Sequence, residues 1–254
     1  MIYLKTDEQL KYLVKAGNIL SECLSFLSLQ VQLGVTGLQI DKMTEDFVRS
    51  YEGASCACKG YQGYPANICI NVNSAAVHSI PNNKPFEPSD IVKLDLVVDY
   101  NGWKCDSAIS VLIPPVKPEV RTLAETTYTA MKMGIETCIE GKTTFDVSTA
   151  IYEARGNCSV IREFTGHSIG RSIHESPQFS NVPIKEKNSL LVAGMVCCIE
   201  PIFCTKNPAI YYNSKEWNTW MLDGGLVSHW EHTLVINPFP QLPTVLTKRY
   251  NETF

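Results

Sequence analysis

The stretch that decides the fold is residues 90–113, DIVKLDLVVDYNGWKCDSAISVLI. Asn101-Gly102 lies between two apolar runs, and this dipeptide is the strongest short-range signal for a two-residue hairpin turn with positive φ angles. The stretch therefore predicts two antiparallel strands. If Asn101 and Gly102 form the turn, Asp106 lies opposite Val97, because both strands are counted outward from the same turn.

The predicted hairpin carries two acids on one face. Side chains alternate along a strand, so Asp95 and Asp106 become diagonal neighbours, roughly 7–8 Å apart at the backbone, a gap that metal ions between two carboxylates can bridge. Two acids beside a core are costly, so the sheet should supply cations or hydrogen bonds there. The alternative is that both acids are solvated hairpin charges. The other face of the first strand is apolar and carries Val92, Leu94, Leu96, Val98 and Tyr100.

Composition indicates a soluble globular protein with a full core. The chain has 254 residues, of which 44% are apolar and 19% charged, enough for one large domain or two small ones. The net charge of −4 and the scattered Lys and Arg argue against a nucleic-acid partner. No apolar run approaches the roughly 18 residues of a membrane span, so no membrane partner is expected.

Cysteine usage predicts a reducing, cytoplasmic location. The N-terminal residues MIYLKTDEQLKYL are charged early and lack the apolar region of a signal peptide. The thiols are therefore expected to be reduced. Cys56-x-Cys58 and Cys197-Cys198 lack the C-x2-C pairs of a structural zinc site, which favours buried small side chains. The ten cysteines are residues 23, 56, 58, 69, 105, 138, 158, 197, 198 and 204.

The remaining pattern alternates helices with strands. Two capping-box sequences, Thr6 to Gln9 and Thr36 to Gln39, predict two amphipathic helices within the first 52 residues. A loop rich in Gly and Tyr follows, and helix, helix and sheet then recur after the hairpin, which suggests two similar halves sharing one sheet. The predicted elements are a loop at 59–65, strands at 68–72 and 77–80, helices from 118 to about 139 and from 144 to 155, and strands from 160 onward.

Further acids and histidines lie in segments that the sequence predicts to be buried. Glu200 and Glu231 fall in the otherwise apolar strands predicted at 195–201 and 230–236, where a carboxylate needs a partner. His167 and His174 lie in a glycine-containing segment that allows close backbone approach to a ligand. Taken singly, each is explained as an edge-strand acid or a hydrogen-bonded core histidine. Together with the two hairpin acids they form a set that no simple core explains. The five histidines are residues 78, 167, 174, 229 and 232.

One motif indicates a different chemistry. Residues 166–170, GHSIG, fit the G-x-S-x-G nucleophile elbow of serine hydrolases, with Ser168 as nucleophile. That fold requires a helix after the serine and a glycine-rich oxyanion loop. Residues 171–177 are polar and end in Pro177, and no HGGG-type loop precedes them, so metal chemistry is favoured over this alternative.

Several motifs, in this order and spacing, resemble the type I methionine aminopeptidases in their short bacterial form. They are KGYQGYP at 59–65, VHSIP at 77–81, Asp95 with Asp106, GHSIGRSIHESP at 166–177, Glu200-Pro201 and Glu231-His232-Thr233. The resemblance covers nearly the whole chain and implies one catalytic domain over residues 1–254. It implies a pseudo-two-fold α/β "pita-bread" fold, in which an antiparallel sheet is covered by helices and a dinuclear metal site lies between the halves.

The resemblance also implies site roles. The metal ligands would be Asp95, Asp106, His167, Glu200 and Glu231, with Asp106 and Glu231 bridging two divalent ions. An oxygen-rich set suits Co, Mn, Fe or Zn, and two such ions would activate a water near neutral pH. Glu200 would move the proton, His174 would stabilise the oxyanion, and His78 would contact the scissile peptide.

The implied function is removal of the N-terminal Met from nascent polypeptides with a small second residue, by a monomer acting where chains emerge from the ribosome. The pocket for Met would be lined by Cys58, Tyr61, Tyr64, Cys69 and Trp217. Two rivals share this fold: Xaa-Pro aminopeptidases, which usually carry an additional N-terminal domain, and non-catalytic binding proteins, which would have lost ligands. The chain departs from the family pattern at Ser79, Ser168, Ser172, Ile173 and His229.

Overall fold

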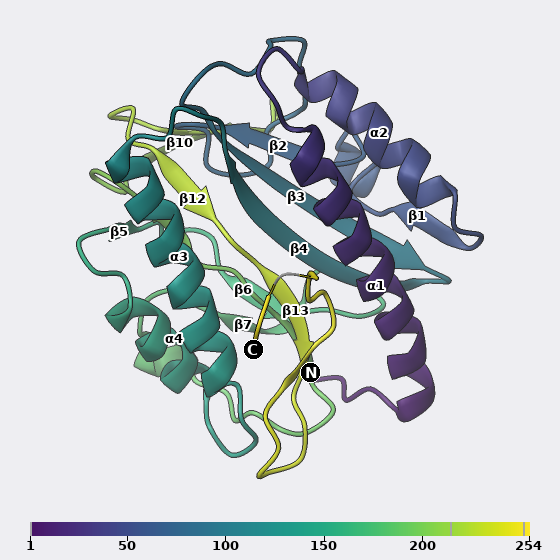
Figure 1. Ribbon diagram of the computed structural model, residues 1–254. Coiled ribbons are helices and arrows are strands. Elements are labelled where there is room, and N and C mark those ends of the chain that lie inside the picture. Colours follow the sequence, from purple (N-terminus) through teal and green to yellow (C-terminus); the bar gives the residue numbers. More distant parts are fainter. Residues whose placement is uncertain (1, 214, 251) are drawn as a thin grey trace.

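The computed structural model describes residues 2–213, 215–250 and 252–254. Two helices precede the sheet strands in each half of the chain, as the sequence predicts. The first pair and the second pair lie on opposite sides of the molecule, with strands between them (Figure 1). These helices are α1 (Asp7–Gln30), α2 (Gly37–Arg49), α3 (Pro118–Thr137) and α4 (Thr144–Glu153).

Capping boxes begin the first two helices. The Thr6 hydroxyl accepts from the Gln9 amide at 3.4 Å, while the Gln9 side chain accepts from the Thr6 amide at 3.1 Å. Thr36 and Gln39 repeat this arrangement at the start of α2. Each box satisfies amides that a helix start would otherwise leave unpaired. The predicted helix starts are therefore confirmed.

The predicted hairpin is the longest strand pair of the structure. β3 (Ile91–Tyr100) and β4 (Trp103–Leu112) are joined by Asn101 and Gly102, whose φ angles are 52° and 84°. Both angles are positive, as a two-residue turn requires. Asp106 pairs with Val97, so the predicted register is confirmed. Along the other edge of β3 lie β1 (Ala54–Cys56) and β2 (Cys69–Val72).

The strand predicted at 77–80 is wrong. His78 has a φ of 63°, in the left-handed region that ends a strand, and Pro81 follows without an N–H to donate. Ser79 makes the segment's contacts to β2: its carbonyl accepts from the Ile70 amide at 3.1 Å, and its amide donates to the Asn71 side chain at 2.9 Å. The backbone therefore turns at His78 instead of continuing as a strand.

The second half contributes three further groups of strands, all paired antiparallel. Among the described residues, no helix is both long and apolar enough to cross a bilayer. All ten cysteines are free thiols. The five-stranded sheet has the order β14 (Thr244–Val245), β13 (His232–Val235), β8 (Val196–Ile199), β6 (Gly166–Ser168) and β7 (Glu175–Phe179). The others are β12 (Val227–His229) with β9 (Ile202–Cys204) and β5 (Ser159–Val160), and the hairpin β10 (Ile210–Asn213) with β11 (Asn218–Met221).

The two halves meet where β4 lies beside β13. The Asp106 amide donates to the Thr233 hydroxyl at 2.9 Å, and that hydroxyl donates to the Asp106 carbonyl at 2.7 Å. The Glu231 amide donates to the Ala108 carbonyl at 3.0 Å. The Ser107 hydroxyl donates to the Glu231 carbonyl at 2.6 Å. These bonds bring acids that are far apart in the sequence to one place.

Candidate metal centre and adjoining pocket

Four carboxylates meet at the junction of the halves; Asp106 and Glu231 are buried, and Asp95 and Glu200 are half-buried. Asp95 and Asp106 come from the hairpin, and each offers a carboxylate oxygen within 4.8 Å of the other and of Glu231. Glu200 follows β8 and Glu231 precedes β13, so both acids lie at strand ends and not inside strands as the sequence suggested. The strand end lets each carboxylate turn toward the junction. The interpretation as solvated hairpin charges is wrong, because Asp106 is only 6% exposed.

Burial makes this cluster costly without cations. It raises the pKa of Asp95 to about 7. It also raises the pKa values of Asp106, Glu200 and Glu231 well above their ordinary range, and neighbouring carboxylates add to each shift. The expected counter-charge does not come from Lys93, which is buried on the same strand face but donates to the Asn73 carbonyl at 2.8 Å. Such a cluster has the charge to hold divalent cations.

His167 reaches the cluster because Gly166 lets β6 approach β8 closely. A Cβ on Gly166 would collide with the Cys198 carbonyl oxygen. The His167 Nδ1 lies 3.0 Å from the Ser168 carbonyl, which leaves Nε2 directed at Glu200, 3.4 Å from its Oε1. Burial lowers the pKa of His167 to about 3, so the ring is neutral, as a metal-binding imidazole must be.

Two further histidines have contrasting surroundings. His229 ends β12 with its Nε2 3.8 Å from Glu200 Oε2, and neither ring nitrogen has a hydrogen-bond partner in the described part of the chain. It therefore joins the candidate site. His232 is a core histidine: its Nδ1 lies 2.9 Å from the Thr247 hydroxyl, and Arg249 donates to its Nε2 at 3.0 Å. For His232, the alternative of a hydrogen-bonded core histidine is therefore correct.

His78 and His174 lie between the acids and an apolar pocket. The His174 ring is 4.4 Å from the His167 ring, centroid to centroid, and its Nδ1 is 2.9 Å from the Tyr61 hydroxyl. The His78 ring packs edge-on against Phe164 at 5.5 Å. Burial lowers the pKa of His78 to about 4 and also lowers that of His174. Both rings are therefore neutral at pH 7 and can donate one N–H each.

The N-terminal segment fastens the strand that follows His174. Lys5 Nζ lies 2.6 Å from Glu175 Oε2, and both side chains are almost fully buried. The Lys5 amide donates to the Gly194 carbonyl at 2.8 Å, and Ile2 forms a parallel bridge with Ser176. These contacts join residues 2–5, far from His174 in sequence, to the two residues that follow it.

The apolar pocket has a volume of about 140 Å³ and shares Asp95, Asp106, His78 and His174 with the acid site. All five residues predicted for the pocket line it. Trp217 stacks edge-on with Tyr64, ring centroids 5.0 Å apart. The sequence reasoning missed Tyr212, which the β10–β11 hairpin brings over the pocket and which carries no local signal. The other lining residues are Gln62, Val97 and Ile173.

The nucleophile elbow is absent. Ser168 ends β6, but the following residues form bends and then β7, so the helix that a serine hydrolase needs after its nucleophile is missing among residues 169–179. Ser168 is buried, and its hydroxyl has no hydrogen-bond partner within the described ranges. Without a base to activate it, Ser168 is not built as a nucleophile.

The donor set fits divalent cations. Asp106 Oδ1 and Glu231 Oε1 are buried without a hydrogen-bond partner among residues the structure describes, and such atoms are costly unless a cation or water binds them. Carboxylate oxygens with one neutral imidazole suit Mn, Fe, Co or Zn. Four carboxylates also carry the charge that balances two divalent ions.

Comparison with known proteins agrees with a peptidase that depends on metal. The chain belongs to metallopeptidase family M24, whose sequence model matches residues 11–238. As a member of this family it is a hydrolase that uses a divalent metal.

The particular relatives are methionine aminopeptidases. The Clostridium perfringens enzyme is 33% identical over 249 residues, covering 97% of this chain and 99% of that protein. The crystal structure of the Rickettsia prowazekii methionine aminopeptidase superposes with a TM-score of 0.93 at 29% identity, covering 98% of this chain and all of that one. The predicted pita-bread α/β fold is thereby confirmed. An X-Pro aminopeptidase from Thermotoga maritima shares the fold at 21% identity, with a TM-score of 0.74, and only 64% of it is covered.

Proposed function

We propose that this protein is a metal-dependent aminopeptidase that removes the N-terminal methionine from polypeptides with a small second residue. The observation that carries the proposal is the shared wall between the acid cluster and the apolar pocket. A side chain held in the pocket has its backbone next to the carboxylates. This chain covers 99% of the Clostridium perfringens methionine aminopeptidase but only 64% of the Thermotoga maritima X-Pro aminopeptidase. This difference in coverage favours peptides with an N-terminal Met over Xaa-Pro peptides as substrates.

Residues 1–254 form the single catalytic domain of this proposal, with five metal-holding side chains. Two divalent ions, Co, Mn, Fe or Zn, are the proposed cofactors. When bound, they supply Lewis acidity toward the scissile carbonyl and lower the pKa of a water molecule. Retention of all five side chains argues against a non-catalytic binding protein. The side chains that would hold these ions are Asp95, Asp106, His167, Glu200 and Glu231, with Asp106 and Glu231 shared between the two ions in this proposal.

Glu200 is the proposed proton carrier. Its two carboxylate oxygens lie 3.4 Å from His167 Nε2 and 3.8 Å from His229 Nε2, so the carboxylate is held between two imidazoles. Burial and the charges of Asp106 and Asp95 raise its pKa. A carboxylate of raised pKa can take a proton from the attacking water and return it to the leaving amine.

His174 and His78 act on the peptide bond. In the tautomer that this role requires, the Tyr61 hydroxyl donates to Nδ1 of His174, 2.9 Å away, and the Nε2–H donates to the oxyanion that forms after attack. His78 lines both cavities and has a φ of 63°, a strained backbone that its surroundings must hold. Its position suits a contact to the scissile peptide.

The rest of the polypeptide has a route away from the pocket. A second cavity, of about 700 Å³, borders His167 and His174 and shares only His174 with the apolar pocket. A peptide anchored by its first side chain would leave through this cavity. Ten free thiols support a cytoplasmic enzyme, and we propose that it acts as a monomer on chains leaving the ribosome.

Metal and serine chemistry make opposite predictions. A chelator should abolish peptidase activity, and added Mn or Co should restore it, because the acid cluster loses its cations. Ser168→Ala should retain activity within about threefold, because replacing a buried Ser by Ala changes the side-chain volume very little. The measurement is cleavage of a Met-Ala peptide by both proteins. Loss of activity in Ser168→Ala with unchanged metal content, together with labelling by a serine-reactive phosphonate, would reverse the assignment.

The pocket predicts selectivity for methionine. Tyr, Trp and Cys side chains around a flexible thioether favour Met through apolar and sulfur–aromatic contacts. Trp217→Ala should raise KM for a Met-Ala peptide roughly tenfold with a smaller change in kcat. Trp220→Ala is the matched control, because Trp220 lies on the same hairpin but outside this pocket. Equal cleavage of Met-Ala and Leu-Ala peptides by the unchanged protein would refute the assigned pocket.

A further inference from the structure

Neighbouring cysteines on β8 face different environments. Cys197 packs in the core beneath α3 and α4, whereas Cys198 belongs to the core of the first half and faces the junction. Alternation of side chains along a strand accounts for the difference. The sequence predicts a buried small side chain at both positions. This accounts for Cys197, but it leaves out that Cys198 faces the junction.

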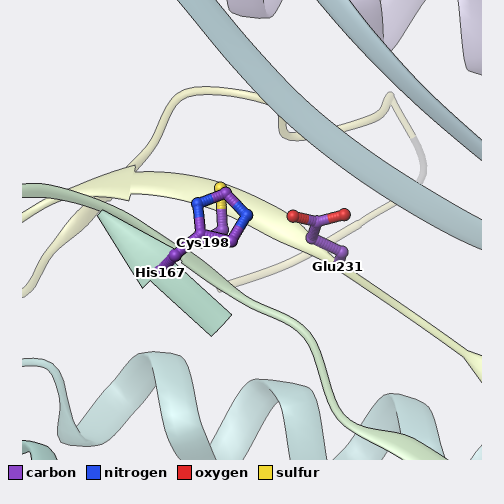
Figure 2. A group of neighbouring side chains, drawn as sticks. All are labelled: His167, Cys198 and Glu231. Carbon is purple, nitrogen blue, oxygen red and sulfur yellow. The ribbon is translucent and has the colours of Figure 1, made fainter. Parts of the chain in front are cut away.

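Cys198 lies within reach of two residues of the metal centre. The Cys198 sulfur, a His167 ring nitrogen and a Glu231 carboxylate oxygen all lie within 4.8 Å of one another, and all three residues are buried. Figure 2 shows the imidazole and the thiol together, with the carboxylate beside them. Atoms that share one zinc-like ion at about 2.0–2.3 Å lie roughly 3–4 Å apart. Small side-chain movements therefore suffice for all three to bind one ion.

The other two side chains of this group point to a cation independently of the thiol. Glu231 is 2% exposed, and its Oε1 lacks a hydrogen-bond partner in the part of the chain that is described. His167 has its Nδ1 at the Ser168 carbonyl, so its Nε2 is available. The thiol itself has a polar neighbour, the Thr233 hydroxyl at 3.4 Å, and that residue joins the halves beside Asp106.

We propose that Cys198 is a sulfur ligand of the divalent metal held by His167 and Glu231. The metal held by these three residues then has nitrogen, sulfur and oxygen ligands. Such a site favours Zn²⁺ or Co²⁺ over Mn²⁺, because thiolate is a soft ligand. On binding, the S–H bond breaks, a sulfur–metal bond forms, and one proton is released to solvent without any change in oxidation state. The inference rests on the metal centre of the proposed function and adds a ligand to it.

The test compares the unchanged protein with Cys198→Ser and Cys197→Ser, each loaded with Co²⁺. A thiolate ligand gives a near-ultraviolet sulfur-to-cobalt charge-transfer band, which should appear in the unchanged protein and in Cys197→Ser but not in Cys198→Ser. Calorimetry in buffers of different ionisation enthalpy should show one proton fewer released by Cys198→Ser. Its Zn²⁺ affinity should fall by at least roughly 10–100-fold, with a smaller change for Mn²⁺.

The outcomes separate this inference from the proposed function. A band that is absent from the unchanged protein, or that survives in Cys198→Ser, overturns the sulfur ligand while metal-dependent peptidase activity can persist. Failure of every variant to bind a divalent ion or to cleave a Met-Ala peptide counts against the function itself. If Cys198→Ser does not fold, Cys198→Ala and the spectrum of the unchanged protein decide the question.

Discussion

Asp106→Asn is expected to abolish tight divalent-metal binding and peptidase activity while leaving the metal-free protein at least as stable as before. Asp106 is buried beside Asp95 and Glu231, and both burial and these charges raise its pKa. Asn keeps the shape but removes one like charge and one bridging ligand. At about 100 times Kd, metal binding stabilises a folded protein by about 2.7 kcal/mol, or roughly 5–10 °C in Tm at this size. The variant should lose that metal-dependent rise.

Above about pH 6.5, where histidines are neutral in both the folded and the unfolded protein, the metal-free protein should also become less stable as the pH rises. The pKa of Asp95 is raised by burial from an ordinary 3.8 to about 7. A folded-state pKa above the unfolded value means that the folded protein holds its proton more tightly. The stabilisation is therefore complete below about pH 4 and is lost as the pH rises through about 7. Asp106→Asn removes a second group of the same sign, so its unfolding free energy should depend less steeply on pH.

Asp99→Asn is the matched control. Asp99 lies on the same hairpin but is partly exposed and pairs with Lys104 at 2.7 Å. Its loss should cost about 0–1 kcal/mol and leave metal binding and turnover unchanged. Metal titration by calorimetry and thermal unfolding between about pH 5 and about pH 8, with and without Mn²⁺, give both readouts. Normal metal affinity in Asp106→Asn would remove Asp106 from the ligand set.

His167→Ala and His174→Ala should fail in different ways. His167 Nε2 faces Glu200 at 3.4 Å, so its removal should weaken metal binding and leave the buried acids less well compensated. His174 is held by Tyr61 and is assigned to the oxyanion, whose charge exists only after attack. Its loss should lower turnover by roughly 10²–10³-fold with little change in ground-state binding.

Calorimetric metal titration of both histidine variants, with kcat and KM measured on one Met-Ala peptide, distinguishes these roles. His174→Ala should still bind two metals and keep a near-normal fold. His167→Ala should bind metal weakly at every pH at which it folds. If His174→Ala loses metal while His167→Ala binds it normally, the two assignments are reversed.

The hairpin could be predicted in full because its information is local. Asn101-Gly102 determines the turn, and a period of two then determines which residues lie opposite, including Asp106 and Val97. Residues 77–80 look like a strand by composition, but the left-handed backbone of His78 depends on what surrounds it. Local pattern cannot predict a strained turn that tertiary contacts hold.

The same distinction between local sequence information and tertiary contacts applies to the candidate site. The acids and His167 could be singled out because charge in an apolar segment is visible in the sequence. Cys198 and Tyr212 could not, because a thiol or a tyrosine is unremarkable until another element is brought beside it. Cys198 meets His167 only through the close approach of β6 to β8 that Gly166 allows.

The Thr233 hydroxyl is hydrogen-bonded to both the amide and the carbonyl of Asp106. These hydrogen bonds bear on the order in which the protein folds during its synthesis. These two residues are 127 positions apart, so the bond closes a very long loop of chain. A growing chain has the hairpin acids long before it has Glu231, so the full set of proposed ligands is present only after the second half has been made. Completion of the metal centre is therefore expected late in synthesis, when the second half packs against the hairpin.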